Sequence, residues 1–226
     1  MSAETNRLKP DEFRLITIPA GSVTLHGELA VPSEPHGIVI FAHGSSGCRH
    51  NPHLQTVATH LRQAGLGTLL FDLLTPEEDA TEMVGQHLRY NMGLLTQRLI
   101  CAAHWVASED EARHLRLGFL GFETSGGAAL VAAADLPEGI GAVVVHSGRV
   151  DLAGGALRRV KCPTLLLADR SEQSIVELNE ETKDLLTCEK KLFVTGSLEE
   201  AMRLTAEWFE WHLGSFMGSR LRVHDW

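Results

Sequence analysis

The sequence predicts a single-domain α/β fold, with one mostly parallel β-sheet and helices on both faces. Three observations support this. Apolar strand-like segments alternate with helix-like segments along the chain, which requires parallel strands joined by right-handed crossovers. The segment 121–127, Gly-Phe-Glu-Thr-Ser-Gly-Gly, joins an apolar strand to an apolar helix. A length of 226 residues suits one domain with a well-buried core.

The composition argues against several classes of function. A formal charge of −9, with no run of Lys or Arg longer than a pair, provides no electrostatic surface for nucleic acid. No stretch is long and apolar enough to span a membrane, and residues 1–12 form a polar segment unlike a signal peptide, so we expect a cytoplasmic protein. The domain is expected to occupy 13–214, followed by a tail over 215–226. Four cysteines without a Cys-x-x-Cys pair argue against a zinc site, and we expect no metal and no cofactor.

The first elements form the expected edge of the sheet. Alternating apolar residues predict strands over 13–18 and 23–31, joined by the turn 20–22 as an antiparallel hairpin. The continuous apolar run 37–42 predicts a strand buried on both faces, followed by a glycine-rich loop over 43–47.

A helix is expected next, starting at Pro52 with Asn51 as its N-cap and ending before Gly65. A strand over 66–72 and a loop over 73–80 follow, and then one long helix from about Thr81 to Ala107. The remaining segments repeat the strand and helix pattern: strand 115–120, helix 128–134, strand 141–146, strand 164–168, helix 174–186, strand 191–195, and a closing helix whose capping box is Ser197 with Glu200.

The segment 121–127 has the small residues that a sharp strand–turn–helix junction requires. Gly121, Ser125 and Gly126 allow strand and helix to approach closely, which places Glu123 at the tip of the turn. This is the pattern of a nucleophile elbow with glutamate in place of serine. Ser125 as the nucleophile is a second reading that fits the turn geometry poorly. Active sites of parallel sheets lie beyond the carboxyl ends of the strands, where this turn is expected.

Three further strings carry a resemblance to a known family. They are Phe-Ala-His-Gly-Ser-Ser at 41–46, Asp-Leu-Leu-Thr-Pro-Glu-Glu at 72–78 and Asp-Leu-Ala-Gly at 151–154. Together with the elbow and the order of elements, they resemble small bacterial α/β-hydrolases of the dienelactone hydrolase type, over nearly the whole chain. The resemblance implies an α/β-hydrolase fold, an oxyanion hole formed by the backbone N–H groups of Ser45 and Thr124, and a triad in the chain order nucleophile, acid, histidine.

The chain departs from that triad. Glu123 stands at the nucleophile position, and the acid position is Asp169 or Glu172. The histidine is expected in a loop after the last strand, where none is present; His212 and His224 are the nearest ones downstream. Serine hydrolysis needs a base within reach of the nucleophile, so ordinary Ser-His-Asp chemistry is not expected.

Three function hypotheses remain. In the first, Glu123 acts with His50 or His146 in non-serine chemistry on a small carbonyl or lactone-like metabolite. In the second, the protein is a catalytically inactive pseudoenzyme that binds a ligand or another protein, and the Glu123 carboxylate caps the N–H groups of Ser45 and Thr124. A third, weaker hypothesis is that a partner subunit supplies the missing histidine.

Other polar residues near the expected site could contact a ligand. Arg49 and His50 precede a helix, a place suited to an anion, although both could equally be solvated. His146 and Arg149 follow a strand and could line the pocket or its rim, and His43 is expected to hold its loop. A homo-oligomer is one expected state, because a group of aromatic residues near the C-terminus could mark an interface or pack inward: Trp208, Phe209, Trp211 and Phe216.

Overall fold

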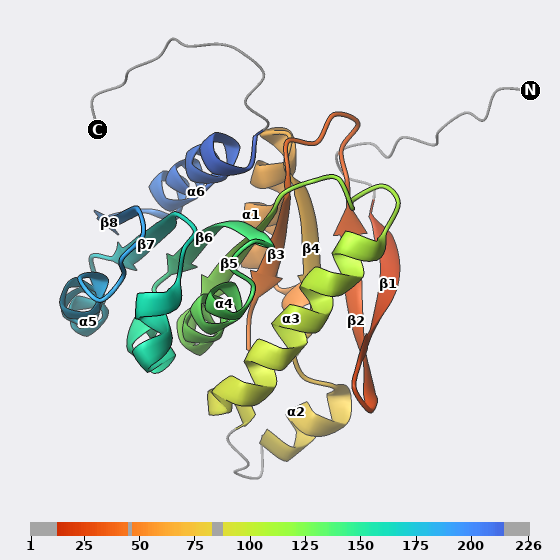
Figure 1. The fold of residues 1–226 in the computed structure, drawn as a ribbon, viewed down its shortest axis with the longest axis horizontal. Helices are drawn as coiled ribbons and strands as arrows, with labels where there is room; N and C mark the ends of the chain where they lie inside the picture. Colours follow the sequence, from red (N-terminus) through yellow and green to blue (C-terminus); the bar gives the residue numbers. More distant parts are fainter. Residues whose placement is uncertain (1–12, 45–46, 83–87, 215–226) are drawn as a thin grey trace, which may run out of the picture.

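The computed structural model describes residues 13–44, 47–82 and 88–214, which form an eight-stranded sheet (Figure 1). The strand order is β1-β2-β4-β3-β5-β6-β7-β8. β1 and β2 form an antiparallel hairpin and β2 also runs antiparallel to β4, whereas all pairs from β4 to β8 are parallel. The strands are β1 (Arg14–Ala20), β2 (Val23–Ala30), β3 (Ile38–Ala42), β4 (Gly67–Phe71), β5 (Leu117–Phe122), β6 (Ile140–His146), β7 (Thr164–Asp169) and β8 (Lys190–Thr195).

Helices cover both faces of this sheet, as the sequence predicts (Figure 1). One face packs against α1 and α6, the other against α3, α4 and α5, and each face has its own buried apolar cluster. The helices are α1 (Pro52–Gln63), α2 (Pro76–Glu82), α3 (Met92–Ser108), α4 (Glu123–Asp135), α5 (Gln173–Lys183) and α6 (Leu198–Leu213), with short 3₁₀ segments η1 (Cys48–His50), η2 (Leu88–Tyr90) and η3 (Val150–Arg159).

The predicted helix caps are confirmed. The Asn51 side chain accepts hydrogen bonds from the N–H groups of His53 and Leu54 at the start of α1. At the start of α6, the Glu200 N–H donates to Ser197 Oγ over 3.2 Å. These local signals identify helix starts because a side-chain acceptor satisfies N–H groups that have no partner within the helix.

The prediction of one helix from Thr81 to Ala107 is wrong. Thr81 belongs to the short helix α2, and the long helix α3 begins at Met92 with Asn91 as its N-cap. The segment 73–80, which was expected to be a loop, contains a capping box. The Thr75 N–H donates to Glu78 Oε2, and the Glu78 N–H donates to Thr75 Oγ1. This reciprocal pair starts a helix at Pro76, ahead of the predicted position.

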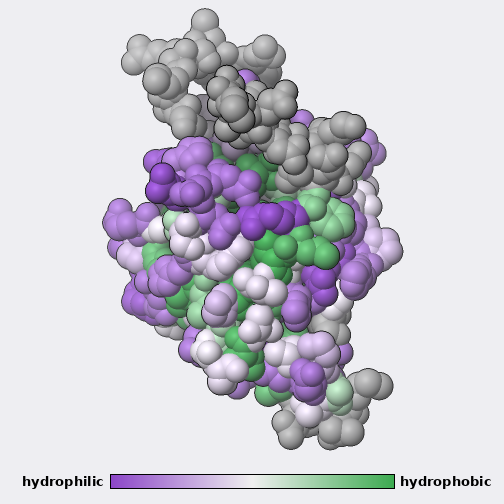
Figure 2. All heavy atoms as spheres, turned by 90° about the vertical axis from the view of Figure 1, so that its right-hand side faces the viewer, coloured by the Kyte–Doolittle hydropathy of each residue, from purple (hydrophilic) through white to green (hydrophobic). Residues whose placement is uncertain are grey.

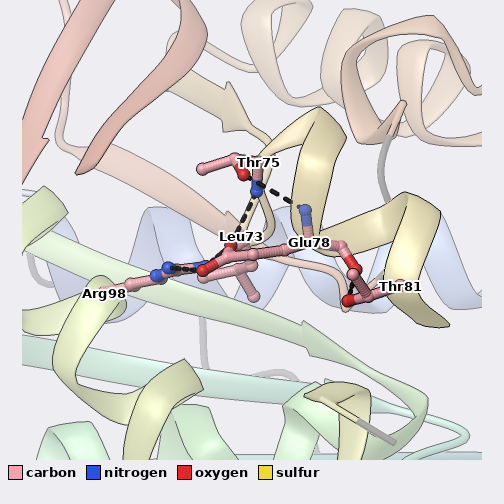
Figure 3. A network of polar contacts seen from close by, with 5 residues as sticks. All are labelled: Leu73, Thr75, Glu78, Thr81 and Arg98. Carbon is pink, nitrogen blue, oxygen red and sulfur yellow. Dashed lines mark hydrogen bonds and ion pairs between the residues drawn. The ribbon is translucent and has the colours of Figure 1, made fainter. Parts of the chain in front are cut away.

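The same glutamate ties α2 to α3 (Figure 3). Arg98 of α3 is only 4% exposed, and its guanidinium donates to both Glu78 carboxylate oxygens over 2.6 Å and to the carbonyl of Leu73. Hydrogen bonding to Arg98 holds the pKa of Glu78 below its usual range, against the opposing effect of partial burial. A buried guanidinium is tolerated here because several acceptors surround it.

We expect Arg98→Met to lower the free energy of unfolding by about 3 kcal/mol, since it leaves the Leu73 carbonyl and the Glu78 carboxylate without their donor. The ion pair should also make stability depend on pH. Because the folded-state pKa of Glu78 is lowered, its contribution is present above the unfolded glutamate pKa of about 4.3 and is lost as the pH falls through the folded-state value. Urea unfolding between about pH 3 and pH 7 measures both effects.

The matched control is Arg159→Met, which removes an exposed ion pair with Asp135. Exposed pairs contribute about 0–1 kcal/mol, so this variant should unfold nearly as the parent does. Equal losses in the two variants would contradict the role of the Arg98 contacts.

The β1 edge of the sheet exposes some apolar side chains. Figure 2 shows this side of the molecule, where apolar atoms lie among polar ones, and Phe13 and Leu15 are 48% and 68% exposed. At the other end of the molecule, Trp208 and Phe209 pack inward whereas Trp211 is 63% exposed. No helix among the described residues has both the length and the apolar character needed to cross a membrane.

Candidate functional site

The junction between β5 and α4 has the geometry of an elbow. Glu123 follows the last residue of β5, starts α4 and has a φ of +48°, a conformation that residues other than glycine rarely adopt. A Cβ on Gly121 would lie 2.7 Å from the Gly126 Cα, so only glycine lets strand and helix meet here. The structure therefore places Glu123 at the tip of the turn, with its side chain exposed, while Ser125 is fully buried.

A second strained turn supports the elbow from the next strand. Ser147, which follows β6, has a φ of +46°, and the Arg149 N–H donates to the Glu123 carbonyl over 2.9 Å. The buried Asn179 of α5 donates from Nδ2 to the Gly148 carbonyl over 3.1 Å. Sequence reasoning missed Ser147 and Asn179; only the Ser-Gly pair after an apolar strand hinted at a turn. Strained backbone conformations of this kind cluster at active sites and ligand-binding sites, and here they occur at the ends of two adjacent strands.

His43 lies beside Glu123. It follows β3, and its ring packs edge-on against Phe122 with 6.2 Å between centroids. Burial lowers the pKa of His43 below its usual value, and the Glu123 and Asp72 carboxylates offset part of that effect. The site thus presents an exposed carboxylate next to a half-buried imidazole.

His146 lies on the other side of Phe122, with 5.8 Å between the ring centroids. Burial lowers the pKa of His146 and His53 lowers it further, whereas the Asp169 and Glu172 carboxylates raise it. The structure therefore brings His146 together with both candidates for the acid position. It pairs His43, rather than His146, with Glu123.

Asp169 is the last residue of β7 and Glu172 follows that strand, and their environments differ. Asp169 Oδ1 accepts hydrogen bonds from the Ser171 hydroxyl and N–H over 2.6 and 2.7 Å, and these bonds lower the pKa of Asp169. Glu172 is exposed at the N-cap position of α5 and makes no side-chain cap. Each carboxylate influences His146 and could orient a polar ligand beside it.

Arg49 is engaged within the protein. Its Nε donates to Asp72 Oδ2 over 2.9 Å, and Gln55 donates both to the Arg49 carbonyl and to Glu28. Asp72 Oδ1 is buried without a hydrogen-bond partner among the described residues. His50 is exposed at the end of η1. An anion contact by Arg49 would therefore compete with its ion pair to Asp72.

Ser45 lies outside the described residues, so the structure describes only the Thr124 side of the expected oxyanion hole. Gly44, the residue before it, lies against the start of α4: a Cβ there would be 2.8 Å from Ser125 Oγ and 3.6 Å from Thr124 Oγ1. Ser125 Oγ is buried and has no hydrogen-bond partner among the described residues. The loop after β3 thus meets the N-terminus of α4, where backbone N–H groups favour negative charge.

His212 lies at the far edge of the sheet from Glu123. It is in the last turn of α6, and the neighbouring Leu213 is within 3 Å of the Cβ positions of Gly37 and Gly141, at the amino ends of β3 and β6. His212 therefore cannot serve the elbow, and His224 lies outside the described residues. Between β8 and α6 the chain has only Gly196 and Ser197.

Within the described ranges, no group of three His, Cys, Asp or Glu side chains is arranged to hold a metal ion. Cys48 is fully buried among apolar core residues, and burial raises the pKa of its thiol, which makes the reactive thiolate scarce at neutral pH.

The parallel sheet, its flanking helices and the strained turn after β5 together define an α/β-hydrolase-fold protein. No family model matches the chain. The crystal structure of dienelactone hydrolase from Anabaena variabilis superposes with a TM-score of 0.86 at 40% sequence identity, over 89% of this chain and 98% of that one. The chain belongs to the dienelactone hydrolase family.

Other relatives add to this picture. Two Mycobacterium tuberculosis proteins, each named "Putative phosphoribosyl transferase", are 40% identical over 216 residues, covering 91% of this chain and 47% of each relative. The chain thus spans about half the length of the curated relatives it matches. A cold-adapted esterase from an Arctic intertidal metagenomic library, with a TM-score of 0.69 and 18% identity over 94% of this chain and all of that one, shares the fold.

Proposed function

We propose that this dienelactone hydrolase-family protein acts on a small carbonyl or lactone-like metabolite, with Glu123 as a general acid–base in place of a serine nucleophile. The observation that carries the proposal is the placement of Glu123. Its exposed carboxylate is held at the elbow tip by a strained backbone, beside His43. An exposed carboxylate beside a half-buried imidazole supports this role, because the two groups can exchange a proton at the edge of the sheet where active sites of parallel sheets lie.

Lactone hydrolysis illustrates the chemistry. Glu123 accepts a proton from a water molecule as the water oxygen attacks the lactone carbonyl carbon. Backbone N–H groups at the start of α4 stabilise the negative carbonyl oxygen. The ring C–O bond then breaks, and Glu123 returns the proton to the leaving oxygen. His43 supplies a second group that can take or give a proton beside the carboxylate.

The alternative is a pseudoenzyme that binds a ligand or a protein partner. The short connection between β8 and α6 favours it, because that connection contains no histidine. The name of the Mycobacterium tuberculosis relatives suggests a third reading, phosphoribosyl transfer. We do not assign it, because a name given to a whole relative need not describe the half that this chain matches.

The proposal is tested by measuring turnover of small five- and six-membered lactones and of aryl esters. Turnover that Glu123→Gln abolishes supports catalysis at the elbow. If no compound is turned over, and thermal shifts by the same compounds persist in Glu123→Ala, the pseudoenzyme account replaces it. Turnover that survives in both variants would place the chemistry elsewhere.

The pH dependence of kcat/KM should follow the ionisation of His43. Because burial lowers its pKa, we expect kcat/KM to fall on the acid side with a midpoint below the ordinary histidine value of about 6.5, and to be flat above it. The variant His43→Gln should lose about 10²-fold or more of the plateau rate. A midpoint above about pH 7, or an unchanged rate in His43→Gln, would remove His43 from the mechanism.

A further inference from the structure

Two cysteines precede neighbouring parallel strands at the edge of the sheet opposite the elbow. β7 and β8 pair with Thr164 opposite Lys190, and the Thr164 N–H donates to the Glu189 carbonyl over 2.9 Å. Cys162 and Cys188 each precede the first paired residue of their strand by two positions, so continuing this register would set them opposite each other. Paired strands lie about 4.8 Å apart, and disulfides bridge Cα atoms about 4.4–6.8 Å apart.

The two side chains point to the same side of the sheet. Cys162 is a buried member of the core cluster on the α3, α4 and α5 face, and Cys188 packs against that cluster. Cys188 Sγ lies 3.7 Å from Thr164 Oγ1, and this hydroxyl donates to the Cys162 carbonyl over 3.2 Å. Both cysteines are free, and Cys188 is the more exposed of the two.

We propose that Cys162 and Cys188 are an oxidative modification site, and that a peroxide closes them into an intramolecular disulfide. Hydrogen peroxide first oxidises the Cys188 thiol to a sulfenic acid and is itself reduced to one water. The Cys162 sulfur then attacks the Cys188 sulfur, the S–O bond breaks, and the oxygen leaves as a second water with the Cys162 proton. Two thiols and one peroxide thus give one disulfide and two waters.

The pKa values of the two thiols determine how fast the disulfide forms. Burial raises the pKa of Cys162 to about 12, with a further contribution from Cys188, and burial also raises the pKa of Cys188. Because the thiolate is the reacting species, oxidation is slow at neutral pH and accelerates about tenfold per pH unit. The burial of Cys162 keeps bulk peroxide away from it, which leaves its thiol available to resolve the Cys188 sulfenic acid.

A disulfide here would anchor the last strand of the sheet. β8 is the last strand in the sheet order and pairs with β7, and the chain between the two cysteines contains α5 and Asp169. Closing this loop restricts the unfolded chain, so the oxidised protein should melt several degrees higher than the reduced protein.

The full chain is treated with hydrogen peroxide at about pH 7 and about pH 9, then alkylated under denaturing conditions and digested. We expect a peptide joining Cys162 to Cys188, formed faster at the higher pH, with a raised melting temperature that dithiothreitol reverses. Cys162→Ser and Cys188→Ser should each abolish the linked peptide, and Cys101→Ser on α3 should leave it unchanged.

Three results would overturn the proposal. In the first, Cys188 is oxidised to a sulfinic acid while Cys162 can still be alkylated. In the second, the disulfide joins two chains instead of forming within one. In the third, both thiols remain unreacted at about pH 9 while Cys101 is oxidised. The readouts are mass and melting temperature, so the result does not depend on whether the elbow is catalytic.

Discussion

Glu123→Gln should lower kcat/KM on a lactone substrate by at least about 10²-fold while leaving the melting temperature within about 2 °C of the parent. The amide has nearly the shape of the carboxylate, but it cannot accept a proton. The side chain is exposed, so its replacement should cost little stability. The measurement is steady-state kinetics together with thermal unfolding.

The control for this variant is Glu138→Gln, which makes the same chemical change in the exposed turn before β6, at the edge of the sheet away from the elbow. It should leave turnover unchanged. Equal losses in Glu123→Gln and Glu138→Gln would reflect net charge rather than general base catalysis, and would count against the proposal.

Two other replacements of Glu123 separate chemistry from strain. Glu123→Gly should raise the free energy of unfolding by about 1 kcal/mol, since glycine adopts the φ of +48° at no steric cost, and should still lose activity. Glu123→Ser should not produce an esterase, because the chain between β8 and α6 supplies no histidine to activate the hydroxyl.

Gly121→Ala should destabilise the protein by about 3 kcal/mol, which corresponds to a melting temperature about 10 °C lower. The added Cβ would lie 2.7 Å from the Gly126 Cα and 3.2 Å from the Ala129 Cβ. The first of these neighbours is backbone, so the overlap is relieved only by moving α4 away from β5. Glu123 starts α4, and turnover should therefore fall beyond what the loss of stability explains.

The matched control is Gly155→Ala in η3, where an added Cβ meets no atom within 4 Å. Its free energy of unfolding should stay within about 0.5 kcal/mol of the parent. If Gly121→Ala unfolds no more easily than Gly155→Ala, the close approach of strand and helix is not what holds the elbow.

The regular parts of the fold were predictable because their signals are local. Asn51 and Ser197 each supply an acceptor to the first turn of the helix that follows, and a continuous apolar run such as that in β3 suits a strand covered on both faces. The long helix was misplaced because the reciprocal pair of Thr75 and Glu78 starts α2 earlier. Its signal is present in the sequence and was not recognised.

The site was predictable only in part. The small residues around Glu123 identify the tip of the turn, because strand and helix cannot meet there otherwise. The partner of Glu123 was not evident, since nothing in the spacing of the histidines singles out His43 over His50 or His146 as its neighbour. That pairing depends on β3 and β5 lying side by side in the sheet.

The sequence by itself determined the class of fold, the helix caps, and a glutamate at the tip of a strained turn, because each depends on residues close together in the chain. The tertiary structure decided which groups share a site. It set His43 beside Glu123, His146 beside Asp169 and Glu172, and Cys162 near Cys188, and it placed His212 at the far edge. These are contacts between neighbouring strands, and sheet order and register, rather than local pattern, bring such residues together.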